Sequence, residues 1–189
     1  LVPRAGQRTT FGSRLHADAI ATDSHELVAQ LDAAGAVSVG ATAAPEFGLA
    51  SYTESLVAPP ARNPYDLVRG AGGSSGGAAA AVAAGLLPFA PGSDGGGSIR
   101  IPAAACGLVG LKPSRGRLPG GSGLDRLAGL VVPGPIARTV ADAALMLDAL
   151  VLAAPWEFAT RAPTPHDGPF LGAAVRGEGR FQLGVMTTS

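Results

Sequence analysis

Two glycine-rich segments of the chain place serine hydroxyls beside runs of main-chain amides. Residues 72–77 read Gly-Gly-Ser-Ser-Gly-Gly and hold Ser74 and Ser75, and residues 92–98 read Gly-Ser-Asp-Gly-Gly-Gly-Ser and end at Ser98. Glycine lets main-chain N–H groups approach a ligand without obstruction by a side chain. Taken alone, each segment more often marks a tight loop or an anion-binding nest than a catalytic site.

Acyl transfer is the chemistry that such serines would perform. A serine hydroxyl is a poor nucleophile unless a neighbouring group takes its proton. The tetrahedral intermediate also needs donors aimed at its negative oxygen, and one such donor is worth roughly 3–4 kcal/mol. The consecutive amides of Gly95, Gly96, Gly97 and Ser98 would supply those donors.

Helices and short apolar strands alternate along the chain, which favours an α/β layer fold. We expect a helix from about residue 24 to 34, closed by a glycine cap at Gly35, and a short buried strand at 36–39. A loop-rich region at 44–77, a helix at 78–87 and a glycine turn at 92–98 follow. The remaining predicted elements are a helix from about 139 to 150, a surface connection at 155–179 and a last strand at 181–186.

The composition excludes several classes of protein. Of the 189 residues 47% are hydrophobic and 15% are charged, which is too apolar for a disordered tail. The formal net charge is zero, so no electrostatic argument supports a nucleic-acid or membrane-surface partner. The longest apolar stretch, residues 78–89, is too short to span a bilayer. A single cysteine, Cys106, excludes an internal disulfide, and its apolar neighbours favour an inert packed thiol.

Together the two serine segments resemble the amidase-signature family of hydrolases. The resemblance rests on residues 72–77, 92–103 and 106–113, and Ser98 follows Ser74 by 24 positions, as is typical of that family. Weaker similarity at residues 6–10, 45–47, 63–66 and 138–142 extends it over nearly the whole chain. It implies a mixed β-sheet core covered by helices. Residues 1–189 would be a partial catalytic domain that lacks a lysine-bearing N-terminal segment and the C-terminal part.

The resemblance also implies a Ser–Ser–Lys triad. Ser98 matches the nucleophile, Ser74 matches the relay serine held in a cis peptide, and Ser75 matches a residue that orients the network. A neutral lysine of the family would deprotonate the relay serine.

The four positions from Gly95 to Ser98 match the oxyanion hole of the family, whose members commonly have Thr or Ile where this chain has Gly95. Only the main chain is needed there, so the change is expected to alter flexibility or pocket shape. Asp94 and Arg100 flank this turn, and we favour scaffolding of the loop over direct contact with substrate for both.

The lysine is the important departure from the family pattern. Alignment of residues 5–10 with the family places that lysine just upstream of Leu1. The sequence holds one lysine, Lys112, in a Gly-Leu-Lys-Pro setting that matches a structural segment of the family. We therefore do not assign Lys112 as the base, and we expect the chain to be a fragment or to depend on residues outside it.

Other candidate sites are weaker. His16, His25 and His166 are scattered along the chain, and we expect surface or structural roles for them. No cluster of His, Cys, Asp and Glu has the spacing of metal ligands. Residues 72–77 lack the following Gly-Lys-Ser/Thr of a phosphate-binding loop, so no nucleotide site is expected.

The leading hypothesis is a parent enzyme that hydrolyses a linear carboxamide through an acyl-enzyme and needs no cofactor. Its partner would be a small-molecule amide, with no nucleic acid bound directly and no membrane; a cytoplasmic location is expected, and a homodimer is left open. A second hypothesis is the A subunit of a tRNA-dependent amidotransferase, which releases ammonia from glutamine. A third is an inactive fragment or pseudoenzyme, because the lysine is absent.

Overall fold

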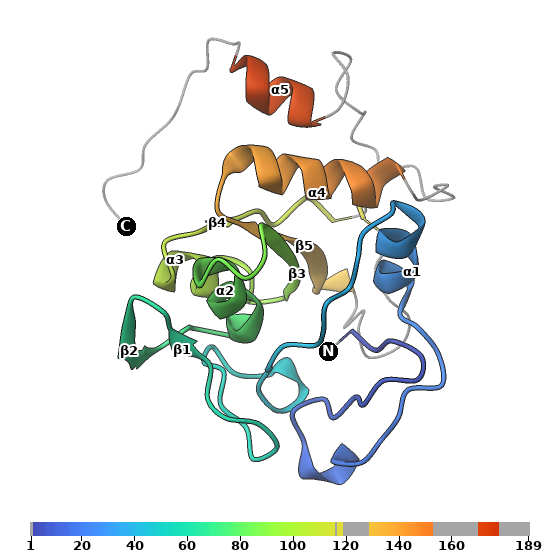
Figure 1. Ribbon diagram of the computed structural model, residues 1–189, viewed down its shortest axis with the longest axis vertical. Helices are drawn as coiled ribbons and strands as arrows, with labels where there is room; N and C mark the ends of the chain where they lie inside the picture. The colour runs from blue at the N-terminus through green and yellow to red at the C-terminus, as the bar shows by residue number, and fades with distance from the viewer. Residues whose placement is uncertain (1, 116, 119–128, 153–169, 178–189) are drawn as a thin grey trace.

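An antiparallel three-stranded sheet forms the centre of the computed structural model, which describes residues 2–115, 117–118, 129–152 and 170–177 (Figure 1). The strands are β3 (Phe89–Asp94), β4 (Val109–Gly110) and β5 (Val132–Ala137), in the order β3-β5-β4. All six residues of β5 are buried, as expected for a central strand. The register pairs Asp94 with Val132, so the last residue of β3 lies beside the first of β5.

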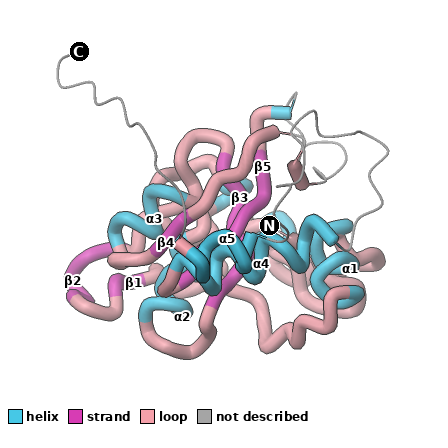
Figure 2. The backbone as a smooth tube through the Cα atoms, turned by 90° about the horizontal axis from the view of Figure 1, so that it is seen from above, coloured by secondary structure: helices cyan, strands magenta, loops and turns pink. Residues whose placement is uncertain are grey.

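Helices cover both faces of this sheet, and neighbouring residues of β3 enter different cores because successive side chains of a strand point to opposite faces. Ala90 of β3 packs in a core with α2 (Gly76–Ala83) and Ile136 of β5. The neighbouring Phe89 packs against the other core, formed by α1 (Glu26–Ala33) and α4 (Val140–Leu152). Figure 2 shows these layers from above. The predicted α/β fold class is therefore confirmed.

Three predicted helices are present with shifted ends. Helix α1 starts after His25, whose Nδ1 accepts the Leu27 N–H at 3.1 Å, and the chain leaves it at Gly35, with φ of +81°. The predicted 78–87 helix is α2, which starts two residues earlier and ends at Ala83. Helix α4 begins after Thr139, whose hydroxyl accepts the Asp142 N–H at 3.0 Å.

Two regions predicted as loop contain regular structure. The hairpin of β1 (Arg62–Asn63) and β2 (Asp66–Gly70) lies in the 44–77 region. A short 3-10 helix, η2 (Glu46–Gly48), precedes it in the same region. Another 3-10 helix, η1 (Arg14–His16), lies near the N-terminus. The predicted surface connection contains α5 (Phe170–Arg176).

The start of α5 is bound to α4 through a carboxylate. The Phe170 and Leu171 N–H groups each donate to Asp148 at 2.8 Å. This tertiary capping contact is invisible in a local sequence pattern. The predicted strand at 181–186 lies outside the described residues.

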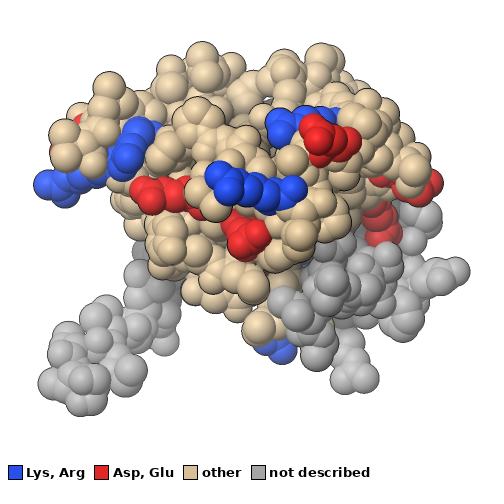
Figure 3. Space-filling model, turned by 90° about the horizontal axis from the view of Figure 1, so that it is seen from below, with Lys and Arg blue, Asp and Glu red and all other residues tan. Residues whose placement is uncertain are grey.

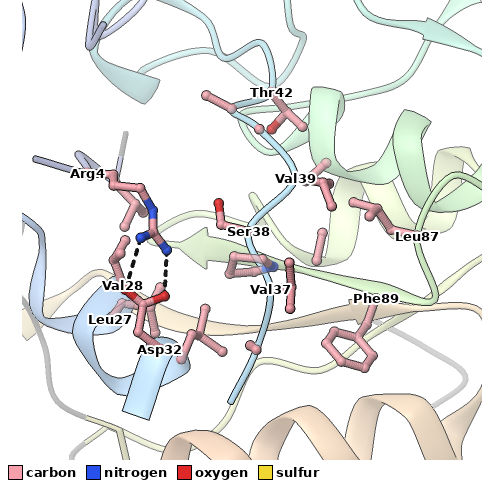
Figure 4. A pocket seen from close by; sticks show the side chains of 18 of the residues that line it. Arg4, Leu27, Val28, Asp32, Val37, Ser38, Val39, Thr42, Leu87 and Phe89 are labelled. Atoms are coloured by element: carbon pink, nitrogen blue, oxygen red, sulfur yellow. Dashed lines mark hydrogen bonds and ion pairs between the residues drawn. The ribbon is translucent and has the colours of Figure 1, made fainter. Parts of the chain in front are cut away.

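The predicted buried strand at 36–39 is wrong. This segment is irregular, and Val37 and Val39 are 86% and 72% exposed. A strand needs a hydrogen-bonded neighbour, and within the described ranges no strand pairs with it. Figure 4 shows Val37 and Val39 lining a pocket of about 240 Å³, together with Leu87 and Phe89.

The predicted glycine turn at 92–98 is also shorter than expected. Residues 92–94 belong to β3, and only residues 95–98 form the turn before α3 (Arg100–Ala105). Gly92 pairs with Gly134 of β5, and a Cβ at Gly92 would lie only 3.0 and 3.1 Å from the Ile99 and Ile136 side chains. Asp94 is thereby fixed by the sheet.

Charged side chains of both signs lie on one face of the described residues (Figure 3). On the face drawn in Figure 3, acidic and basic side chains lie near one another, without an extended field of either sign. Described ion pairs include Arg69–Asp66 at 3.0 Å and Arg4–Asp32 at 2.6 Å. No helix in the described ranges has the length and apolar character needed to cross a membrane.

Candidate active site

The two serine turns lie against each other, although 24 positions separate Ser74 from Ser98. The first turn leads into α2 and the second into α3. The Ser75 N–H donates to the Ser98 carbonyl at 3.3 Å. The Ser75 hydroxyl accepts the Ser93 N–H at 3.3 Å and reaches the Ser93 carbonyl at 3.5 Å. Ser75 therefore joins the first turn to Ser98 at the end of the second turn and to Ser93 in the strand before it.

Ser74 is almost enclosed, with 3% of its surface exposed, whereas Ser98 is half-buried. The Gly73–Ser74 peptide is cis. Among the described residues the hydrogen bonds between the two turns run through the main chain and Ser75, and none joins the Ser74 and Ser98 hydroxyls. A proton relay between these hydroxyls stays a prediction.

Asp94 organises the second turn from the end of β3. Its carboxylate is 1% exposed and accepts the Gly97 N–H at 2.7 Å and the Ile99 N–H at 3.3 Å. Two Arg100 guanidinium nitrogens, Nε and Nη2, donate to its two oxygens at 2.9 Å each. These contacts are those of a loop scaffold, the role favoured for Asp94 and Arg100 from the sequence.

The ionisation of Asp94 follows from these contacts. Burial by itself would raise the pKa of this carboxyl group. Hydrogen bonds from Arg100, Gly97 and Ile99 outweigh that effect and hold the pKa below its usual value. The end of β3 therefore presents to the turn a carboxylate that stays charged at neutral pH.

The hydrogen bonds of Asp94 reduce the number of main-chain N–H groups that could form the oxyanion hole. Because the Gly97 N–H is donated to Asp94, the amides of Gly95, Gly96 and Ser98 remain as the candidate donors. Gly97 has φ of +117°, a conformation that L side chains rarely adopt, and a Cβ there would lie 2.8 Å from Ile101. A Cβ on Gly95 would come within 3.2 Å of Val131, so a larger residue at this position needs a small local shift.

Thr53 contacts the main chain of the Ser74 turn, and it was not among the site residues predicted from the sequence. Its hydroxyl donates to the Gly72 carbonyl at 2.8 Å, lies 3.3 Å from the Ser74 carbonyl, and accepts the Gly76 N–H at 3.1 Å. Thr53 lies in an irregular loop without periodicity, so no local signal separates it from an exposed threonine.

The other residues singled out in the sequence lie in structural settings. His25 caps α1, and the His16 ring packs edge-on against Phe11 and Phe47. Lys112 donates to the Pro113 carbonyl at 2.8 Å. Cys106 is fully buried, and burial raises the pKa of its thiol.

His166 lies outside the described residues. No group of three or more His, Cys, Asp or Glu side chains gathers as a metal site within the described ranges.

An α/β core carrying two joined serine turns is compatible with serine-based acyl transfer. The chain matches the Amidase family over residues 2–189. AmiB2 from Mycobacterium tuberculosis is 51% identical over 183 residues, which are 97% of this chain and 37% of that relative. The A subunit of glutamyl-tRNA(Gln) amidotransferase from Thermus thermophilus is 48% identical over 145 residues, 77% of this chain and 31% of that relative.

The solved structure of 6-aminohexanoate cyclic dimer hydrolase complexed with substrate has the same fold over most of this chain. Its TM-score is 0.80 at 38% identity, and the match covers 90% of this chain and 36% of that one. The chain therefore belongs to the amidase-signature family. It spans about a third of the length of these relatives.

Proposed function

We propose that the protein containing this chain hydrolyses carboxamides, with Ser98 as the acyl-accepting nucleophile and Ser74 as its proton relay. The observation that carries the proposal is the junction of the two turns, in which the Ser75 N–H donates to the Ser98 carbonyl at 3.3 Å. Membership of the amidase-signature family supports the reaction class.

In the proposed reaction, Ser98 Oγ bonds to the amide carbon while its proton passes through the Ser74 hydroxyl. The resemblance to the amidase-signature family assigns a neutral lysine to receive that proton. The amides of Gly95, Gly96 and Ser98 would hold the negative oxygen of the tetrahedral intermediate. The proton then returns to the leaving nitrogen as the C–N bond breaks. Water releases the acyl group from Ser98 and restores the hydroxyl.

The decisive experiment uses the full-length protein, a simple aryl amide and a fluorophosphonate probe. Wild-type protein should turn over the amide and be labelled at Ser98. Ser98→Ala should lose both properties and keep the wild-type circular dichroism spectrum. Ser114→Ala, a change at an exposed serine, is the matched control and should keep both. Normal turnover by the Ser98→Ala variant would refute the proposal.

The substrate is proposed to be a linear carboxamide. One structural relative is a hydrolase named for a cyclic dimer, so a pair of linear and cyclic amides of equal length is the direct comparison. A higher kcat/KM for the cyclic member would overturn the linear assignment. The cytoplasmic location remains a prediction from the sequence, and a homodimer is left open.

A glutaminase role is the second candidate, because the amidotransferase A chain from Thermus thermophilus is 48% identical to this chain. Glutaminase activity that rises on addition of the other amidotransferase chains and charged tRNA would favour this role. Absence of probe labelling at Ser98 in the full-length protein would instead favour a pseudoenzyme.

A further inference from the structure

Thr53 lies where three main-chain groups of the Ser74 turn meet. It is 2% exposed and comes from the loop between η2 and β1, outside both glycine segments. Its partners are the carbonyls of Gly72 and Ser74 and the N–H of Gly76. These groups bracket Ser74 on both sides along the chain.

The chemistry of a hydroxyl fits this position. One O–H donor and two acceptor lone pairs allow Thr53 to donate to the Gly72 carbonyl at 2.8 Å while accepting the Gly76 N–H at 3.1 Å. The Ser74 carbonyl, at 3.3 Å, is the secondary acceptor of the same proton. A valine of the same shape would leave these buried or half-buried main-chain groups without that partner.

Main-chain hydrogen bonds also hold Thr53 in place. Its carbonyl accepts the Ala61 N–H at 2.9 Å, and the Ala61 carbonyl accepts the Ala71 N–H at 3.0 Å, next to the Ser74 turn. The neighbouring Tyr52 main chain leaves no room for a side chain at Gly73, where a Cβ would lie 2.6 Å from the Tyr52 carbonyl. A Cβ on Gly76 would collide with the Thr53 hydroxyl. Loop and turn therefore fit together closely along residues 72–76.

We propose that Thr53 is a positioning residue for catalysis: by fixing the main chain on both sides of Ser74, it holds the Ser74 hydroxyl in the direction needed to exchange a proton with Ser98. Thr53 acts through Ser74 and touches no reacting atom. This inference rests on the proposed relay role of Ser74. A misplacement of about 1 Å in a reacting group costs on the order of 100-fold in rate, which sets the expected effect.

The test compares Thr53→Val, Thr53→Ala and Thr53→Ser in the full-length protein. Thr53→Val and Thr53→Ala should lower kcat by about 100-fold and leave KM within about threefold, because the chemical step suffers and ground-state binding does not. The rate of fluorophosphonate labelling of Ser98 should fall in parallel. Thr53→Ser keeps the hydroxyl and should stay within about fivefold of wild type in both measurements.

Thr139→Val is the matched control for the loss of a threonine hydroxyl. Its hydroxyl caps α4 by accepting the Asp142 N–H, and it makes none of the contacts with the Ser74 turn. It should destabilise the fold while leaving kcat at the wild-type value. If Thr53→Val does not fold, the comparison of Thr53→Ser with Thr53→Ala at a temperature where both are folded decides the matter.

The outcomes separate this inference from the proposed function. Turnover by Ser98→Ala would remove the nucleophile assignment, and the inference with it. An inactive Ser98→Ala together with a folded Thr53→Val or Thr53→Ala of wild-type kcat would overturn the role of Thr53 alone. A Thr53→Ser variant as slow as Thr53→Ala would do the same, because the methyl group and not the hydroxyl would then matter.

Discussion

Replacing Asp94 with asparagine removes the charge that holds the Ser98 turn against the end of β3. One carboxylate oxygen, Oδ1, accepts the Gly97 N–H and Arg100 Nη2, and the other, Oδ2, accepts the Ile99 N–H and Arg100 Nε. An asparagine amide has one acceptor oxygen and one NH₂ donor group. In either orientation, its NH₂ group therefore faces one main-chain N–H and one guanidinium N–H.

The size of the effect follows from the two hydrogen bonds lost. A hydrogen bond to a charged group contributes about 1.5–3 kcal/mol, and the lost main-chain bond is at an oxygen that is enclosed in the fold. The Arg100 side chain is 56% exposed, so solvent screens the lost ion pair and its loss adds little. We expect Asp94→Asn to lower the free energy of unfolding by about 3 kcal/mol at pH 7.

Urea denaturation followed by circular dichroism measures this difference. Asp66→Asn is the matched control, because Asp66 also accepts a main-chain N–H, from Val68 at 3.1 Å, and an arginine nitrogen, from Arg69 at 3.0 Å. Its side chain is 44% exposed, so its loss should cost less than about 1 kcal/mol. Equal losses for the two variants would refute the reasoning from burial.

The difference should also depend on pH. The folded-state pKa of Asp94 is lowered, so its charge stabilises the fold fully above the unfolded pKa of about 3.9. That contribution is lost as pH falls from there through the folded-state pKa. The gap between wild type and Asp94→Asn should be constant from pH 7 to about pH 5 and narrow below about pH 4. A gap unchanged at pH 3 would contradict the assignment.

Three further predictions concern the Ser98 turn, the core beside α4 and the buried thiol. Gly97→Ala should lower the free energy of unfolding by about 1–2 kcal/mol, because Gly97 has φ of +117°. Gly96→Ala should change that free energy by less than about 0.5 kcal/mol, because the Cβ position of Gly96 is open space. Thermal unfolding compares the two variants. Leu150→Ala, at a fully buried position, should cost about 3 kcal/mol in urea denaturation, against less than about 1 kcal/mol for Leu145→Ala, whose side chain is 44% exposed. Cys106 should react with a thiol reagent at pH 8 at least about tenfold more slowly in native than in urea-unfolded protein, because its thiol is buried with a raised pKa; equal rates would contradict this.

Structural features that depend on residues adjacent in the sequence were predicted correctly. Helix α4 was expected because apolar residues recur at helical spacing behind Thr139, and the helix runs from Val140 to Leu152. The cap at Gly35 was predicted for the same kind of reason, since a left-handed φ favours glycine. Local chemistry decides both features.

Two features that depend on residues far away in the sequence were predicted wrongly or not at all. Residues 36–39 are apolar enough for a strand but have no hydrogen-bonded neighbour among the described residues, so they stay irregular. Helix α5 depends on Asp148, 22 positions away, which accepts its first N–H. Neither the missing neighbour of residues 36–39 nor the Asp148 cap can be read from a window of local sequence.

By itself the sequence determined which segments carry the candidate chemistry, because glycine spacing and serine position are properties of the chain. The tertiary structure decided how those segments meet. In the folded protein the Gly97 N–H donates to Asp94, the Ser75 N–H donates to the Ser98 carbonyl, and the Thr53 hydroxyl donates to the Gly72 carbonyl. These contacts form when burial forces polar main-chain groups to find partners, and those partners are chosen by the packing of the whole fold.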